Sequence, residues 1–227
     1  MIISHSKQFV FVHIYKTGGT SIRNCLIKYG TMRQRIFHEF KPTRKLILLL
    51  NRTVLNHRWS DEDFKTFLGI HNHALAREIK EYMGEELFNQ YFTFSVVRNP
   101  WDWQLSLYFF SKRINWNTKY YESSNKFNFK DYLKFHLDNQ PPLLLDFVTD
   151  LEGNIIVDKI CKVENIDQDF KEILEKLGMD SSKIVVPQKN VSSNRERDYR
   201  IKYDQESADL VGDYFQKDVD YFKYSFE

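Results

Sequence analysis

Two adjacent glycines, Gly18 and Gly19, constrain the fold of this chain more than any other feature. They follow the apolar run at residues 9–14, whose side chains favour β-structure, and a glycine turn bounds that run as it would a buried strand. They precede residues 21–29, where apolar side chains recur at helical spacing. The chain therefore opens with a predicted strand, a tight turn and a predicted helix. That order is typical of α/β proteins, in which parallel strands alternate with covering helices.

A second strand-to-helix turn lies near the middle of the chain. Residues 91–97 form the second predicted strand, and Arg98, Asn99 and Pro100 end it. Because the fixed φ of proline suits the first turn of a helix, residues 101–113 are predicted to be helical. The carboxyl ends of parallel strands share one edge of a sheet, and ligands of such folds bind there. We therefore expect both turns at the same edge.

The remaining pattern predicts one domain over residues 1–227, with a central parallel sheet flanked by helices. Ser60 marks a helix start, whereas residues 46–50 fit a strand and a buried helical turn equally well. The other predicted helices are residues 74–83, 129–137, 166–177 and 206–221, with an added turn at 85–90 and a strand at 155–163.

Charge and cysteine content exclude several classes of protein. The 33 basic and 31 acidic residues give a net charge of +2, which is too balanced to indicate nucleic-acid binding. Cys25 and Cys161 are far apart and lack zinc-ligand spacing, which favours a reducing compartment. No signal sequence or membrane span is predicted. We expect a cytoplasmic protein without a membrane or nucleic-acid partner.

The glycine turn carries the groups of an anion-binding site. Glycines let the backbone approach an anion closely, and the helix that follows offers N–H groups and the positive end of its dipole. Hydroxyl groups and one lysine add further donors and a charge. The predicted site for a phosphate-like group consists of Lys16, Thr17, Gly18, Gly19, Thr20 and Ser21.

Other interpretations of this turn stay open at the level of the sequence. In the nucleotide-binding loop GxxxxGK[ST] the lysine follows the glycines, whereas Lys16 precedes them. Asp146 is the best downstream candidate for a magnesium ligand, and it is a weak one. A metal-dependent phosphotransferase of the P-loop class is the main alternative. A non-catalytic nucleotide-binding module and a purely structural glycine turn are two others. No metal site is predicted.

Arg98 and Ser106 form a second candidate anion site. The planar guanidinium of Arg98 suits a phosphate dianion, and Ser106, about two turns along the next predicted helix, adds a hydroxyl donor. Alone, Arg98 would be explained by a surface ion pair. Together with the glycine turn at the same sheet edge, it indicates one ligand with two separated phosphate-like groups.

Both motifs resemble those of sulfotransferases that use 3′-phosphoadenosine 5′-phosphosulfate (PAPS). Residues 11–21 are similar to their 5′-phosphosulfate loop, and residues 94–102 with 106–108 to their 3′-phosphate motif. The carbohydrate-type branch, related to the chondroitin and heparan enzymes, is the most similar, and residues 198–226 also resemble it. Tyr15 stands where that branch usually has proline, and Trp103 where a basic residue is common.

The resemblance implies a P-loop-like fold and transfer of a sulfuryl group from PAPS to an acceptor hydroxyl, without a required metal. Lys16 would neutralise charge on the leaving phosphate, as a catalytic group. Because no membrane anchor is predicted, the resemblance is to a soluble bacterial-type member. The acceptor would be a carbohydrate or a small metabolite, and a net charge of +2 gives little support for a long polyanionic glycan.

Transfer to a hydroxyl also needs a base, for which histidine is suited near neutral pH. His71 and His73 resemble the His-x-His segment of heparan 2-O-sulfotransferases, in which histidine is the base. We favour His73, then His71, with helix capping and metal binding as alternatives. Glu78 or Asp102 is the fallback base. His13, in the first strand, is interpreted as buried support.

The polar segment at residues 186–198 is predicted to be mobile and to lie over the site. Its basic residues and the one that follows, Arg195, Arg197 and Arg200, would close over the 3′-phosphate. A solvated basic loop explains them equally well.

Overall fold

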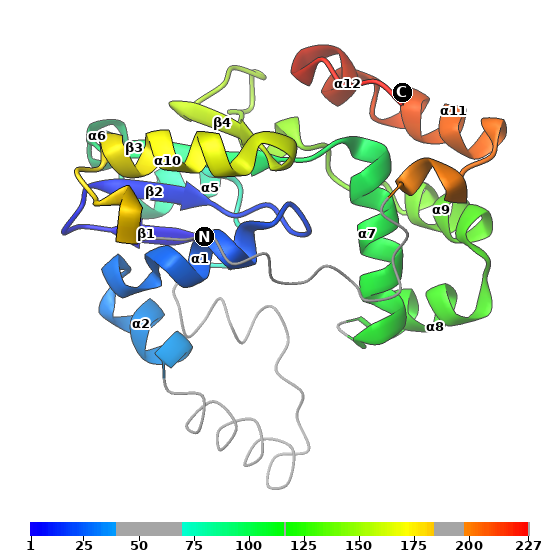
Figure 1. The fold of residues 1–227 in the computed structure, drawn as a ribbon, viewed down its shortest axis with the longest axis horizontal. Helices are drawn as coiled ribbons and strands as arrows, with labels where there is room; N and C mark the ends of the chain where they lie inside the picture. The colour runs from blue at the N-terminus through cyan, green and yellow to red at the C-terminus, as the bar shows by residue number, and fades with distance from the viewer. Residues whose placement is uncertain (40–69, 116, 184–197, 227) are drawn as a thin grey trace, which may run out of the picture.

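Four strands form one sheet in the order β1-β2-β3-β4 (Figure 1). They are β1 (Ile2–Ser4), β2 (Phe9–Val12), β3 (Phe92–Val97) and β4 (Lys159–Lys162). The computed structural model describes residues 1–39, 70–115, 117–183 and 198–226. Strands β2, β3 and β4 are parallel, as expected. The expectation of a wholly parallel sheet is wrong at the edge, because β1 pairs antiparallel with β2. Only residues 5–8 connect them, which is too short for a crossover.

Helices cover both faces of this sheet. Alternate side chains of β2 point to opposite faces, so Phe11 packs with α1 (Gly19–Leu26) and α10 (Ile166–Lys176) in one apolar cluster. Val10 and Val12 pack into the other cluster, with α5 (Ala76–Met83) and α6 (Glu85–Gln90). Burial on both faces explains the continuous apolar runs of the parallel strands.

A group of helices extends beyond the carboxyl edge of the sheet (Figure 1). It begins with α7 (Pro100–Arg113), which leaves the end of β3 directly. Asn99 caps α7 by accepting a hydrogen bond from Trp101 N at 3.1 Å. Packed with or near α7 are α8 (Thr118–Lys126), α9 (Phe129–Asp138), η5 (Tyr199–Lys202) and α11 (Gln205–Tyr214). The other elements are η1 (Ile27–Tyr29), α2 (Met32–Glu39), η2 (Leu145–Phe147), η3 (Val163–Asn165), η4 (Ser181–Lys183) and α12 (Gln216–Phe222).

Most predicted helices are confirmed within a few residues, but two helices were missed and two predictions need correction. Helices α2 and α8 were not predicted, because their sequences are largely polar. The strand expected at 155–163 is shorter, and Ile155 forms only an isolated bridge with Thr149. The closing helix expected at 206–221 is broken at Phe215, whose φ and ψ are −96° and 23°. Phe215 is fully buried against the ring of Trp103, so tertiary packing interrupts the helical pattern.

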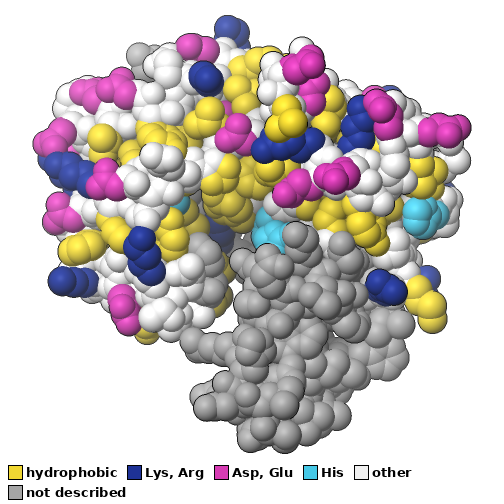
Figure 2. All heavy atoms as spheres, turned by 180° about the vertical axis from the view of Figure 1, so that it is seen from behind, with side chains coloured by type: hydrophobic (Ala, Val, Ile, Leu, Met, Phe, Trp, Pro, Cys, Tyr) yellow, Lys and Arg dark blue, Asp and Glu magenta, His cyan; other side chains and the backbone are white. Residues whose placement is uncertain are grey.

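Some sequence expectations concern residues whose positions are not described. Residues 46–50, Ser60, Arg195 and Arg197 lie outside the described ranges. Within those ranges, no helix is long and apolar enough to span a bilayer. Side chains of both charge signs are interspersed on the face seen in Figure 2, which fits the near-neutral net charge.

Candidate functional site

The two strand-to-helix turns meet at the carboxyl edge of the sheet. Strands β2 and β3 run parallel with Val12 opposite Ser95, so both chains leave the sheet on the same side. The guanidinium of Arg98 donates a hydrogen bond from Nη1 to the carbonyl oxygen of Lys16 at 2.9 Å. The expectation of a shared edge is therefore confirmed, and the two predicted anion motifs are in direct contact.

The loop between β2 and α1 is a compact turn with two residues at positive φ. Lys16 has a φ of 63° and Gly18 a φ of 75°, so the backbone enters the left-handed region twice within three residues. Thr17 is fully buried, and its hydroxyl donates to the carbonyl oxygen of Ile14 at 2.9 Å. The Thr17 hydroxyl thus holds the loop together by bonding to its own backbone.

The first residue of α1, Gly19, is a glycine for a steric reason. A Cβ atom at Gly19 would lie 2.1 Å from Cδ2 and 2.5 Å from Nε2 of His13, closer than real contacts allow. The N-cap is Gly18, which has no side chain to satisfy the first N–H groups of the helix. Thr20 is exposed, and Ser21 is buried with its N–H bonded to Gly18 O at 3.0 Å. An anion at this helix start meets the N–H groups of Gly19 and Thr20, which no side chain of the N-cap residue covers, and the positive end of the dipole.

Two side chains from the β3–α7 region hold the loop in place. Arg98 binds Lys16 O, and it also contacts Asp102 Oδ2 through Nε and Nη2, both at 2.5 Å. Trp103 donates from Nε1 to Tyr15 O at 2.7 Å. Burial lowers the pKa of Arg98 to about 10, so the guanidinium stays charged at neutral pH. Sequence reasoning missed these positioning roles, although the spacing of Arg98 and Asp102 and the unusual Trp103 were signals for them.

Ser106 lies on the face of α7 that is turned toward this loop. Residues 102, 106 and 110 are one helical turn apart in succession and therefore share a face. At one end of that face Asp102 binds Arg98. At the other end Lys16 Nζ lies 4.3 Å from the centre of the Phe110 ring. The half-buried Ser106 lies between these two contacts.

The His71–His73 segment lies beside the loop. The Nδ1 atom of His73 is 2.8 Å from His13 O, and because a carbonyl only accepts, Nδ1 carries the proton and Nε2 has the lone pair. The ring centre of His73 is 4.6 Å from that of His13 and 5.9 Å from that of Tyr15. Burial lowers the pKa of His73 to about 3, which keeps it neutral. His71 Nδ1 accepts from His73 N at 3.1 Å.

Comparison with known proteins identifies the family. The model of the sulfotransferase family matches residues 1–225, nearly the whole chain. The chain belongs to the sulfotransferase family. An uncharacterized protein of Archaeoglobus fulgidus is 30% identical over 103 residues, which are 44% of this chain and 79% of that protein. No solved structure matches the chain. Membership supports an enzyme that transfers sulfuryl groups.

Other candidate residues of the sulfotransferase have partners of their own. Arg200, in η5, forms a bidentate ion pair with Asp198 at the surface, through Nε and Nη2, both at 2.9 Å. Glu78 accepts a hydrogen bond from Leu75 N, and Asp146 accepts one from Leu143 N. Both carboxylates therefore cap local backbone. Among the described residues, no group of three His, Cys, Asp or Glu side chains is placed to hold a metal ion.

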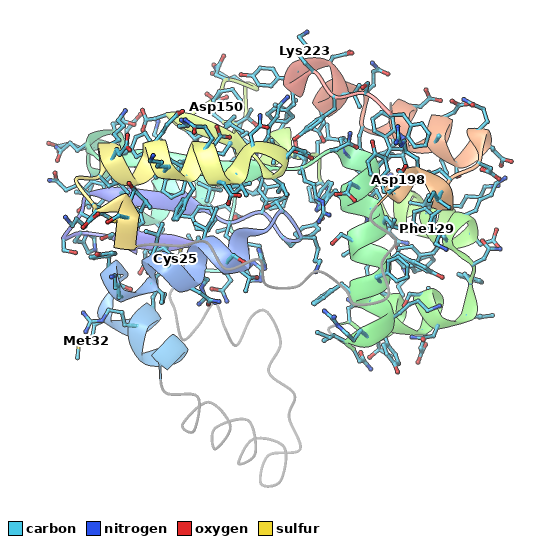
Figure 3. All side chains as sticks on the ribbon, viewed as in Figure 1. Cys25, Met32, Phe129, Asp150, Asp198 and Lys223 are labelled. Atoms are coloured by element: carbon cyan, nitrogen blue, oxygen red, sulfur yellow. The ribbon has the colours of Figure 1, made fainter. Side chains whose placement is uncertain are left out.

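The segment after β4 and the end of the chain also fix the site, and sequence reasoning missed both. Glu164 Oε1 accepts from Asn99 N at 2.9 Å, and Oε2 accepts from the Tyr224 hydroxyl at 3.1 Å. Asn99 Nδ2 donates to Ser225 O at 2.8 Å. Lys223, labelled in Figure 3, has a φ of 54° and ends α12, which leads the chain into this contact. No local sequence signal links residues so far apart.

Proposed function

We propose that this sulfotransferase moves the sulfuryl group of PAPS to an acceptor hydroxyl by in-line transfer. The observation that carries the proposal is the contact between Arg98 and Lys16 O, at 2.9 Å. It sets a charged guanidinium beside the uncapped start of α1. A single nucleotide with phosphate groups on both its 3′ and 5′ positions binds the Arg98 guanidinium and the start of α1 at the same time.

In this proposal the donor is held at its two ends. The backbone N–H groups from Thr17 to Thr20, with the Ser21 hydroxyl, bind the 5′-phosphosulfate, and Lys16 neutralises the charge that develops on the leaving phosphate oxygen. Arg98 and Ser106 bind the 3′-phosphate. The contacts of Arg98 with Asp102 and Lys16 leave further N–H groups of its guanidinium for that purpose. Arg197 and Arg200 join the 3′-phosphate when the donor binds. Adenosine 3′,5′-bisphosphate is the product, and no metal ion is needed.

We assign the base to His73. Its Nδ1–H donates a hydrogen bond to His13 O, which leaves the lone pair on Nε2. In the reaction, that lone pair accepts the proton of the acceptor hydroxyl. The acceptor oxygen forms a bond to sulfur while the bond from sulfur to the bridging oxygen breaks, and the electron pair leaves with the bisphosphate. Negative charge of the bound donor raises the proton affinity of this buried ring. His71 supports His73 by accepting its backbone N–H.

The acceptor in this proposal is a carbohydrate or a small metabolite that carries a hydroxyl group. The net charge of +2 provides little attraction for a polyanionic glycan. Neither Cys25 nor Cys161 forms a disulfide, which favours a reaction in the reducing cytoplasm.

Replacing His73 tests the assignment of the base. We expect His73→Ala to lower the rate of transfer from labelled PAPS by about 10²- to 10⁴-fold, because a general base contributes that much. The affinity for adenosine 3′,5′-bisphosphate, measured by calorimetry, should change little, because His73 does not hold the donor.

His5→Ala is the matched control, since His5 is an exposed histidine bonded to the Tyr91 hydroxyl in the β1–β2 turn. This variant should retain both activity and binding. Transfer by His73→Ala at the rate of the wild-type protein would refute the role of His73.

A further inference from the structure

We propose that His13 is a further anion-contacting side chain, whose Nε2–H donates a hydrogen bond to the group bound at the glycine loop. The inference rests on the proposed function, because it needs an anion at the start of α1. It assigns to His13 a direct contact with the ligand, in place of the supporting role expected from its position in the sequence.

The first observation is the position of the imidazole edge. Nε2 and Cδ2 of His13 occupy the space where a Cβ atom of Gly19 would be, at 2.5 Å and 2.1 Å from that position. In an α-helix the Cα–Cβ bond tilts toward the N-terminus. The Nε2 edge of His13 therefore lies at the N-terminal end of α1, beside the N–H groups that an anion would meet there.

The second observation is that packing fixes this ring. His13 is 7% exposed, and its ring stacks on Phe11 with centres 5.5 Å apart and an interplanar angle of 24°. The ring centre of His73 lies 4.6 Å from that of His13. A ring held in this way loses little conformational entropy when a ligand binds.

The third observation is the hydrogen bonding of the ring. Nδ1 of His13 is buried and has no hydrogen-bond partner in the described part of the chain. Burial, followed by the neighbouring His73, lowers the pKa of His13 well below its usual value, so the ring is neutral and one nitrogen carries the proton. A proton on Nε2 avoids an unpaired buried N–H group, which is costly. It also faces the site, where an anion accepts a strong charge-assisted hydrogen bond.

These features give His13 and His73 different roles in the proposed reaction. His13 holds an oxygen of the 5′-phosphosulfate through Nε2, and its carbonyl group fixes the tautomer of His73. His73 removes the proton from the acceptor. Gly19 is a glycine because any side chain there would displace the edge of His13.

Two substitutions at this position separate the hydrogen bond from the packing. His13→Phe keeps a ring of similar size without a donor, whereas His13→Gln keeps an N–H donor near the place of Nε2. Calorimetry measures the affinity of each variant for adenosine 3′,5′-bisphosphate and for adenosine 3′-monophosphate. The comparison isolates the loop, because only the bisphosphate has a phosphate group that reaches it.

We expect His13→Phe to bind the bisphosphate about 10- to 100-fold more weakly, the loss typical of a hydrogen bond to a charged group. His13→Gln should lose no more than about five-fold. Both variants should bind the 3′-monophosphate like the wild-type protein. If His13→Phe does not fold, His13→Asn replaces it, because its shorter amide reaches only the place of Nδ1 and should also weaken the bisphosphate.

Other outcomes overturn the inference. Wild-type affinity of His13→Phe for the bisphosphate would show that Nε2 makes no contact with the anion, while the proposed function would stand. An equal loss for both nucleotides would show a structural role only. Absence of bisphosphate binding by the wild-type protein would overturn the proposed function and this inference with it.

Discussion

At the scale of single residues, the two glycines of the loop have different physical roles. Gly18 has a φ of 75°, which costs an L-residue energy whatever space surrounds it. Gly19 has no such φ, and it is a glycine because His13 fills the place of its Cβ. The sequence predicted that both glycines permit a close approach to an anion. It could not show that one of them makes room for a neighbouring histidine, because that contact depends on how β2 places His13.

Alanine substitutions should separate these two roles. We expect Gly18→Ala to lower the free energy of unfolding by about 1–2 kcal/mol, the cost of a left-handed residue. Gly19→Ala should lower it by about 1–3 kcal/mol through overpacking. The measurement is urea unfolding followed by circular dichroism.

The double variant with His13→Ala gives the control. In the His13→Ala background, Gly19→Ala should lower the free energy of unfolding much less than it does in the wild type, whereas the cost of Gly18→Ala should be the same in both backgrounds. A Gly19→Ala protein as stable as the wild type would show that the steric contact is absent in solution.

At the scale of elements, helix starts were easier to predict than helix ends. Pro100 and the cap residue Asn99 define the start of α7 locally, and the prediction there is confirmed. The end of α11 depends on the distant Trp103, against which Phe215 packs. Helix α12 is anchored in the same way. Asp218 is fully buried, and its carboxylate accepts hydrogen bonds from Leu144 N and Leu145 N at 2.8 Å and 2.9 Å.

The buried Asp218 should make stability depend on pH. Burial raises its pKa to about 6 from an ordinary value of 3.8, so the folded protein binds this proton more tightly than the unfolded chain. The contribution of Asp218 to stability is therefore present at acidic pH and is lost as the pH rises from about 4 to about 6. A difference of roughly two pKa units corresponds to about 3 kcal/mol.

Comparison with Asp218→Asn isolates this effect from other titrating groups. The difference in unfolding free energy between wild type and variant, measured in urea at pH 4.5 and pH 7.5, should shift in favour of the variant at the higher pH. The same difference at both values would contradict the raised pKa.

At the scale of the whole molecule, the sequence predicted how the site is assembled better than what supports it. The site comes from local strand–turn–helix units, and the parallel pairing of β2 and β3 brings Lys16 and Arg98 together. The support comes from distant parts of the chain. Glu164 and Ser225 form hydrogen bonds with Asn99, and no local sequence pattern predicts either contact. The antiparallel β1 escaped prediction because a three-residue strand is too short for periodicity.

The central claim is that one ligand with phosphate groups on both the 3′ and 5′ positions binds across Arg98 and the glycine loop. Calorimetric titration of the protein with adenosine 3′,5′-bisphosphate, ADP and ATP, each with and without magnesium, tests it most directly. We predict that the bisphosphate binds at least about 10-fold more tightly than ADP or ATP, and equally well without magnesium, because only it places phosphates at both sites. Preferential binding of ATP in the presence of magnesium would contradict the account and would favour a phosphotransferase.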